Sequence, residues 1–240
     1  VAITGVVLAL FGLVNSPLQP VTGRLSDRVG RRKIFVLIGL VVLATASFAY
    51  TLASIYWHLV GLRILQGIAG AFIIPTTVAL VNDLATEGNR GGNMGTYNTF
   101  RLVGFGVGPI AAGGVVDAGP YALDIGVRHI VLTGFDAAFL FAAFTATLAF
   151  GLVVALIHDP DIEPADPDDD DSEIAIFDAT GTHLLDTIFT LGVVSFFMAV
   201  GIAVFATLGD LVNTRLDQGP TMFGLQFAAF VLAQIFLQAP

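Results

Sequence analysis

Residues 23–33 read Gly-Arg-Leu-Ser-Asp-Arg-Val-Gly-Arg-Arg-Lys and separate two long apolar stretches of the chain. Five of the ten Lys and Arg residues of the chain lie in this short segment, together with a single acid, Asp27. Loops rich in Lys and Arg remain on the cytoplasmic side of a membrane, by the positive-inside rule. We therefore expect residues 23–33 to form a tight cytoplasmic turn between two membrane-spanning helices.

The residue types in this turn suit such a place. Gly23 and Gly30 allow a positive φ and a close approach of the backbone. The bases can contact anionic lipid headgroups, each contributing about 1 kcal/mol near the surface. Asp27 has two interpretations: it exchanges basic partners when helices rock, as a latch for alternating access, or it joins a static surface network worth about 0–1 kcal/mol per pair.

The composition of the chain is that of a membrane protein. Hydrophobic residues make up 55% of its 240 residues, charged residues only 12%, and the mean hydropathy is +0.85, whereas soluble proteins are about a quarter charged. About 20 helical residues cross the hydrocarbon core. We predict an all-α polytopic fold with seven spans, at residues 1–20, 34–51, 57–81, 94–116, 137–157, 184–208 and 222–240.

Residues 158–183 differ from the rest of the chain, because they hold ten of its nineteen acidic residues and no Lys or Arg. Such a segment cannot bury apolar surface, so we interpret it as a solvated cytoplasmic linker between residues 1–157 and 184–240. A cation-binding segment is the alternative. The net charge of −9 also suggests a protein adapted to high salt, from a halophilic microbe.

The segment 23–33 resembles the signature of the major facilitator superfamily, Gly-x-Leu-x-Asp-Arg-x-Gly-Arg-Arg, and fills every position of it. The resemblance implies a fold of twelve helices in two pseudo-symmetric halves, of which this chain covers roughly helices two to eight. Residues 1–157 would hold helices two to six, and residues 184–240 helices seven and eight. It also implies a conformational switch loop formed by Gly23, Asp27, Arg28, Gly30, Arg31 and Arg32.

Arg63 lies inside the third predicted span, where a charged side chain costs about 2.5–3.5 kcal/mol on insertion scales. Helical spacing places Arg63, Gln66 and Gly67 on one face, which we expect to point at neighbouring helices. The alternative is that Arg63 extends to the outer surface. The stretch resembles the fourth-helix motif Arg-x-x-Gln-Gly, which implies a role in proton transfer.

Arg101 is a second charge within a predicted span. Its candidate partners are Asp83, Asp27 or a residue outside this chain. The predicted spans carry no acid near their middle, so a proton-carrying acid is expected in a helix that precedes residue 1.

The fourth predicted span contains a glycine-rich run. The spacing of Gly104 and Gly108 predicts a close approach of two helices, and Pro109 predicts a bend. The run resembles the antiporter motif Gly-x-x-x-Gly-Pro-x-x-Gly-Gly of the fifth helix, with Ala112 in place of one glycine and Gly113 matching the last. The resemblance implies export.

The leading interpretation is a secondary active transporter of the plasma membrane that exports a small molecule by alternating access, coupled to protons, and functions as a monomer. Asn15 and Asn98 are weak candidates for a substrate cavity. An importer or uniporter of the same fold, or a non-transporting sensor or scaffold, are the alternatives.

Other classes of function lack support in the sequence. No nucleophile–base pair or phosphate loop is found, so we expect neither an enzyme nor a cofactor. His158 and His183 match no ligand spacing, so no metal is expected. Nucleic-acid binding conflicts with the negative net charge.

Overall fold

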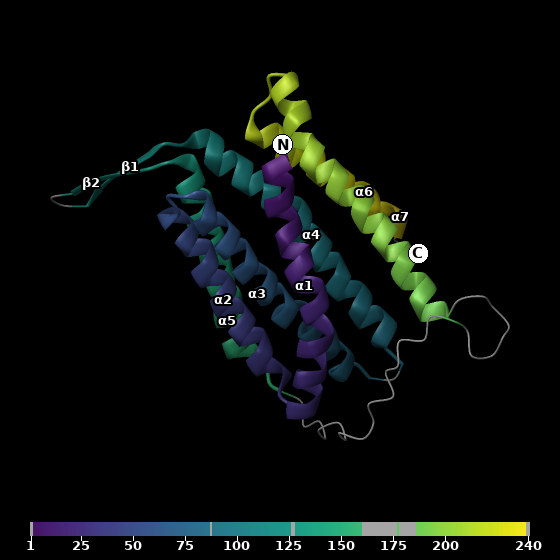
Figure 1. The fold of residues 1–240 in the computed structure, drawn as a ribbon. Helices are drawn as coiled ribbons and strands as arrows, with labels where there is room; N and C mark the ends of the chain where they lie inside the picture. The colour runs from purple at the N-terminus through teal and green to yellow at the C-terminus, as the bar shows by residue number, and fades with distance from the viewer. Residues whose placement is uncertain (1, 87, 126–127, 160–176, 178–185, 239–240) are drawn as a thin grey trace.

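The computed structural model describes residues 2–86, 88–125, 128–159, 177 and 186–238. These residues form seven α-helices, a short 3-10 helix and one β-hairpin (Figure 1). The helices are α1 (Ala2–Val29), α2 (Arg32–Ala49), α3 (Tyr56–Asp83), α4 (Arg90–Ala118), α5 (Gly134–Leu156), α6 (Thr187–Arg215) and α7 (Pro220–Gln238), and the 3-10 helix is η1 (Tyr50–Leu52). Each predicted span therefore corresponds to one helix, and the all-α membrane fold is confirmed. Most of residues 158–183 lie outside the described residues.

Five helices of the described chain, α1 to α5, are long and apolar enough to cross a membrane. Many of their large apolar side chains lie on the surface, for example Leu13 (68% exposed), Phe100 (75%) and Leu156 (68%). Exposed apolar surface of this extent fits contact with lipid rather than with water.

Several predicted helix ends were wrong because the helices continue beyond the hydrocarbon core. Both α1 and α3 have 28 residues, which is about 42 Å at 1.5 Å per residue, against a core of about 30 Å. The first span was expected to end at Pro20, but α1 contains Pro17 and Pro20 and ends only at Val29. Prolines are tolerated in membrane helices, where neighbouring groups satisfy the freed backbone.

A β-hairpin was not predicted within the loop that joins α4 and α5. Strands β1 (Tyr121–Ile125) and β2 (Arg128–Leu132) pair antiparallel, with Tyr121 opposite Leu132. The hairpin projects from one end of the helices, whereas the junctions α1–α2 and α3–α4 lie at the opposite end (Figure 1). The chain therefore alternates between two ends of the helix group, as successive membrane spans require.

The first half of the chain forms a packed group of helices. Helix α3 packs against α1 and α2, α2 also packs against α5, and α4 packs mainly against α7. Small residues permit these contacts: a Cβ at Gly67 would lie 3.0 Å from the carbonyl oxygen of Phe11, and a Cβ at Gly39 would lie 3.0 Å from that of Ala69. Close backbone approach at small residues is the usual basis of helix association in membranes.

Candidate functional site

The turn between α1 and α2 is much shorter than predicted. Residues 23–29 belong to α1, and only Gly30 and Arg31 join the two helices. Gly30 has a φ of 64° and its N–H donates to the carbonyl of Ser26 (3.0 Å). A left-handed glycine is the common end of an α-helix, so the second glycine of the segment ends α1, and Gly23 does not form a turn.

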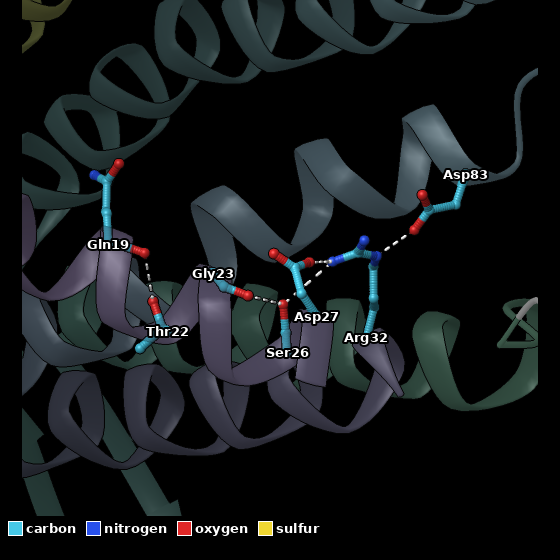
Figure 2. Close-up of polar contacts among 7 residues, drawn as sticks. All are labelled: Gln19, Thr22, Gly23, Ser26, Asp27, Arg32 and Asp83. Atoms are coloured by element: carbon cyan, nitrogen blue, oxygen red, sulfur yellow. Dashed lines mark hydrogen bonds and ion pairs between the residues drawn. The ribbon is translucent and has the colours of Figure 1, made fainter. Parts of the chain in front are cut away.

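Arg32, the first residue of α2, connects α1, α2 and α3 at the end of the helix group where α1 turns into α2, which is the inner end in the predicted orientation (Figure 2). Its Nη1 forms an ion pair with Asp27 of α1, and its Nε forms one with Asp83 at the end of α3. Nη1 also donates to Ser26 Oγ (3.3 Å). The planar guanidinium suits this role because it presents several donors in fixed directions, which an ammonium cannot do.

The Arg32 side chain is largely buried, with 11% of its surface exposed, whereas Asp27 keeps 43% and Asp83 22%. Loss of one carboxylate would leave a poorly solvated cation with fewer partners, which costs more than the loss of a surface pair. The cluster of Ser26, Asp27, Arg32 and Asp83, which we call the inner cluster, therefore holds α1, α2 and α3 together at this end.

Lys33 and Asp159 make a second connection beside the inner cluster. The Nζ atom of Lys33 donates to the carbonyls of Val154 (3.0 Å) and Ile157 (2.6 Å) at the end of α5. The N–H of Lys33 donates to Asp159 Oδ1 (2.7 Å). A cation thus meets the C-terminal end of one helix and a carboxylate meets the N-terminal end of another, both favourable placements.

Three further residues of the predicted switch loop, Gly23, Arg28 and Arg31, differ in position and exposure. Gly23 lies within α1, and a Cβ there would have no heavy atom within 4 Å. Arg28 is exposed in the last turn of α1. Arg31 is exposed and precedes α2 without a side-chain cap.

Arg63, Gln66 and Gly67 are brought together on the face of α3 that contacts α1. Arg63 Nη1 donates to Gln66 Oε1 (2.9 Å), and its guanidinium carbon lies 6.0 Å from the centre of the Phe11 ring. The Nε of Arg63 is buried without a hydrogen-bond partner among the described residues. The arginine is thus held between helices, with one donor unused.

Asn15 lies one helical turn further along the same interface. It is 3% exposed, its oxygen accepts from Gln19 Nε2, and its Nδ2 is buried without a described partner. A Cβ at Gly70 would collide with this nitrogen. Together with Arg63, Asn15 gives the α1–α3 interface two buried donors without a described partner, and such groups are rare in protein interiors.

Arg101 does not pair with either acid that was considered for it. Its Nη2 donates to Asn98 Oδ1 (3.0 Å), one turn earlier on α4, and the residue is exposed. Asp27 and Asp83 are both engaged by Arg32. Of the three candidate partners, the two acids within this chain are therefore engaged elsewhere in the described structure, and a partner outside this chain stays a prediction.

The glycine-rich part of α4 contacts α7, but not through Gly104 and Gly108, the pair from which a close approach of two helices was predicted. A Cβ at Gly104 or Gly108 would have no heavy atom within 4 Å. The close approach is made instead at Gly113, where a Cβ would lie 2.7 Å from the carbonyl oxygen of Pro220.

The same interface is equally tight on the side of α7. A Cβ at Gly224 would lie 2.5 Å from the carbonyl oxygen of Pro109. Gly106 adds a looser contact, with Val231 Cγ1 3.5 Å from a Cβ placed there. Gly106, Pro109 and Gly113 follow one another at intervals of three and four residues, so they lie on one face of α4. This face forms the interface with α7.

Sequence reasoning missed three residues of the site. Asp83 was considered only as a partner of Arg101, although an acid at the inner end of a span beside a basic turn indicates an ion pair. Lys33 and Asp159 gave no local signal, since their contact joins residues 126 positions apart. No group of three or more metal-binding side chains occurs among the described residues, and His183 lies outside them.

Comparison with known proteins identifies the family of this chain. The profile of the Major Facilitator Superfamily matches residues 1–240. The chain is 26% identical over 156 residues to the quinolone resistance protein NorA of Staphylococcus aureus, an alignment that covers 65% of this chain and 36% of that protein. It is 29% identical over 160 residues to multidrug resistance protein 1 of Bacillus subtilis, covering 67% of this chain and 37% of that protein. The chain thus spans little more than a third of these relatives.

Proposed function

Because this chain belongs to the Major Facilitator Superfamily, we propose that it forms part of a secondary active transporter that exports a small molecule by alternating access, in antiport with protons. The chain is a multi-pass membrane protein. In this proposal the transporter lies in the plasma membrane, functions as a monomer, and exposes residues 23–33 and 158–183 to the cytoplasm.

The observation that carries the proposal is the position of Arg32 between Asp27 and Asp83. Alternating access requires the inner ends of helices to hold one arrangement and then release it. Asp27 is the more exposed of the two acids, so it is the carboxylate that other groups can reach. In this proposal Asp27 exchanges partners during the cycle, while Asp83 keeps Arg32 in place.

Alternating access is supported by the α4–α7 interface, and export by the names of the relatives. Helix α4 belongs to residues 1–157 and α7 to residues 184–240, so their contact at Gly113 and Gly224 joins the two proposed halves. Both relatives are named for resistance, one to quinolones and one to multiple drugs. We therefore propose a drug-like amphipathic substrate.

The α1–α3 interface is the proposed place for coupling. Arg63 keeps an unused buried donor, and so does Asn15, so a water molecule, substrate or carboxylate from outside this chain could bind there. A fixed positive charge at Arg63 would lower the proton affinity of a nearby acid and favour release. Asn98 is held by Arg101, so it is a weaker candidate for substrate contact.

The test is transport by the full-length protein in inside-out membrane vesicles, with a fluorescent quinolone as the probe. An imposed proton gradient, acidic inside the vesicle, should drive quinolone accumulation. Asp27→Asn should reduce the initial rate by more than tenfold. Asp217→Asn is the matched control, because Asp217 is exposed and its φ of 53° suits asparagine well.

The alternatives give different results in the same vesicles. Quinolone leaving the inside-out vesicles under that gradient would indicate an importer. Equilibration without response to the gradient would indicate a uniporter. If no tested compound moves although the protein is folded, a sensor or scaffold is favoured.

A further inference from the structure

The N-terminus of α7 lacks a cap of its own. Gly219, directly before the helix, has no side chain, and Pro220 has no N–H to offer. Thr221 therefore carries the first free N–H of the helix. Such N–H groups are usually satisfied by the side chain of the capping residue itself.

Asp117, from the outer end of α4, occupies this position instead. The N–H of Thr221 donates to Asp117 Oδ2 (3.0 Å), and the hydroxyl of Thr221 donates to the same oxygen. A Cβ at Gly219 would lie 3.3 Å from Asp117 Oδ2, so the absent side chain leaves the space that the carboxylate uses. A negative charge at a helix N-terminus is also favoured by the helix dipole.

The end of α4 that carries Asp117 is held firmly. Gly134, the first residue of α5, packs so closely on the backbone of Val116 that a Cβ would lie 2.9 Å from its Cα. The hydroxyl of Tyr121 donates to the carbonyl of Val115 (2.9 Å). Asp117 is thus fixed to the first half of the chain, while the N–H and the hydroxyl that donate to it belong to Thr221 in the second half.

We propose that Asp117 is an outer latch, which caps α7 from the other half and stabilises the state that is closed on the outer side. The proposal rests on alternating access as proposed above. Opening toward the outside separates α4 from α7 and removes the only side-chain acceptor that the described residues show for the Thr221 N–H. The capping bonds are therefore present in one state and absent in the other, which makes Asp117 a positioning residue of the transport cycle.

The experiment measures the distance between the halves in the full-length protein. Phe135→Cys and Leu216→Cys place spin labels at exposed positions near the outer ends of α5 and α6, and this chain has no cysteine to interfere. Asp117→Ala should raise the ratio of long to short distances about fivefold, which is about 1 kcal/mol and the usual contribution of a helix cap. Asp117→Asn keeps an acceptor oxygen, so its ratio of long to short distances should lie between those of the wild type and Asp117→Ala.

A second variant separates a latch from a simple helix cap. Gly219→Ser supplies a capping hydroxyl within the second half itself, and the φ of Gly219 is not positive. In the Asp117→Ala background it should restore thermal stability but leave the long distances enriched. If it restores the distance distribution as well, Asp117 only stabilises α7 and the latch is refuted.

Two further outcomes are decisive. An unchanged distance distribution in Asp117→Ala also refutes the latch, whether or not the protein transports quinolone. Failure of the wild-type protein to transport would refute the proposed function, while the distance measurement would still report on Asp117.

Discussion

Arg32 at the start of α2 and Asp83 at the end of α3 form an ion pair that joins residues 51 positions apart in the chain. The same guanidinium binds Asp27 through a different nitrogen, so the arrangement depends on a side chain with several fixed donors.

Arg32→Lys should therefore impair transport although it keeps the charge. A lysine has one ammonium group and cannot reproduce two separately directed contacts, so we expect a loss of about tenfold in initial rate, corresponding to about 1.4 kcal/mol. Quinolone uptake into inside-out vesicles measures this. Arg90→Lys, at an exposed site on the same side, should have no effect, and equal activity of both variants would contradict the role of Arg32.

Asp83→Asn should resemble Asp27→Asn in transport but differ from it in stability. Asp83 is the less exposed partner of Arg32, so its neutralisation leaves a largely buried charge with a weaker contact. We expect the thermal midpoint in detergent to fall more for Asp83→Asn than for Asp27→Asn. The opposite order would show that Asp27, rather than Asp83, keeps Arg32 in place.

Gly113→Ala should disturb the α4–α7 interface. The added methyl would meet the Pro220 carbonyl at 2.7 Å, and over-packing of this kind typically costs about 1–3 kcal/mol. Reduced quinolone transport and a lower thermal midpoint are expected. Gly114→Ala is the matched control, because a Cβ there has no heavy atom within 4 Å; an equal effect at both positions would argue against close packing at Gly113.

Thr22→Val should weaken the contact between α1 and α3. The buried hydroxyl donates to the carbonyl of Ala71 (2.5 Å), and hydrogen bonds between membrane helices contribute about 0.6 kcal/mol on average. A fall of that order in unfolding free energy should appear in denaturant titrations in mixed micelles. Thr99→Val is the control, since the Thr99 hydroxyl bonds only within α4 to Gly95 in the described structure (2.9 Å).

The sequence was sufficient to predict the seven helices and the turn between the first two, because long apolar stretches and clustered bases are local signals. It did not predict where α1 ends, since prolines at 17 and 20 break helices in water but not here. The hairpin at residues 121–132 was missed because its strands lie between the predicted spans 94–116 and 137–157, a segment for which no secondary structure was predicted.

The site was predicted where a motif lies within one segment. Asp27 and Arg32 were identified together, and Gln66 was placed beside Arg63, because helical spacing fixes such neighbours. Contacts between distant segments could not be predicted from the sequence. Asp83 was only one of three candidate partners of Arg101, and its pair with Arg32 was not predicted. The contact of α4 with α7 is made at Gly106 and Gly113, whereas the sequence pointed to Gly104 and Gly108 for a close approach of two helices.

The first turn of α2 fixes the rotation of that helix about its own axis. Arg32 and Lys33 are neighbours, so their side chains leave the helix about 100° apart, one toward α1 and α3 and the other toward α5. Any turning or sliding of α2 alone would break both sets of contacts at once. If Asp27 of α1 exchanges partners as proposed, the motion that preserves the remaining contacts is a displacement of α2, α3 and α5 as a single block.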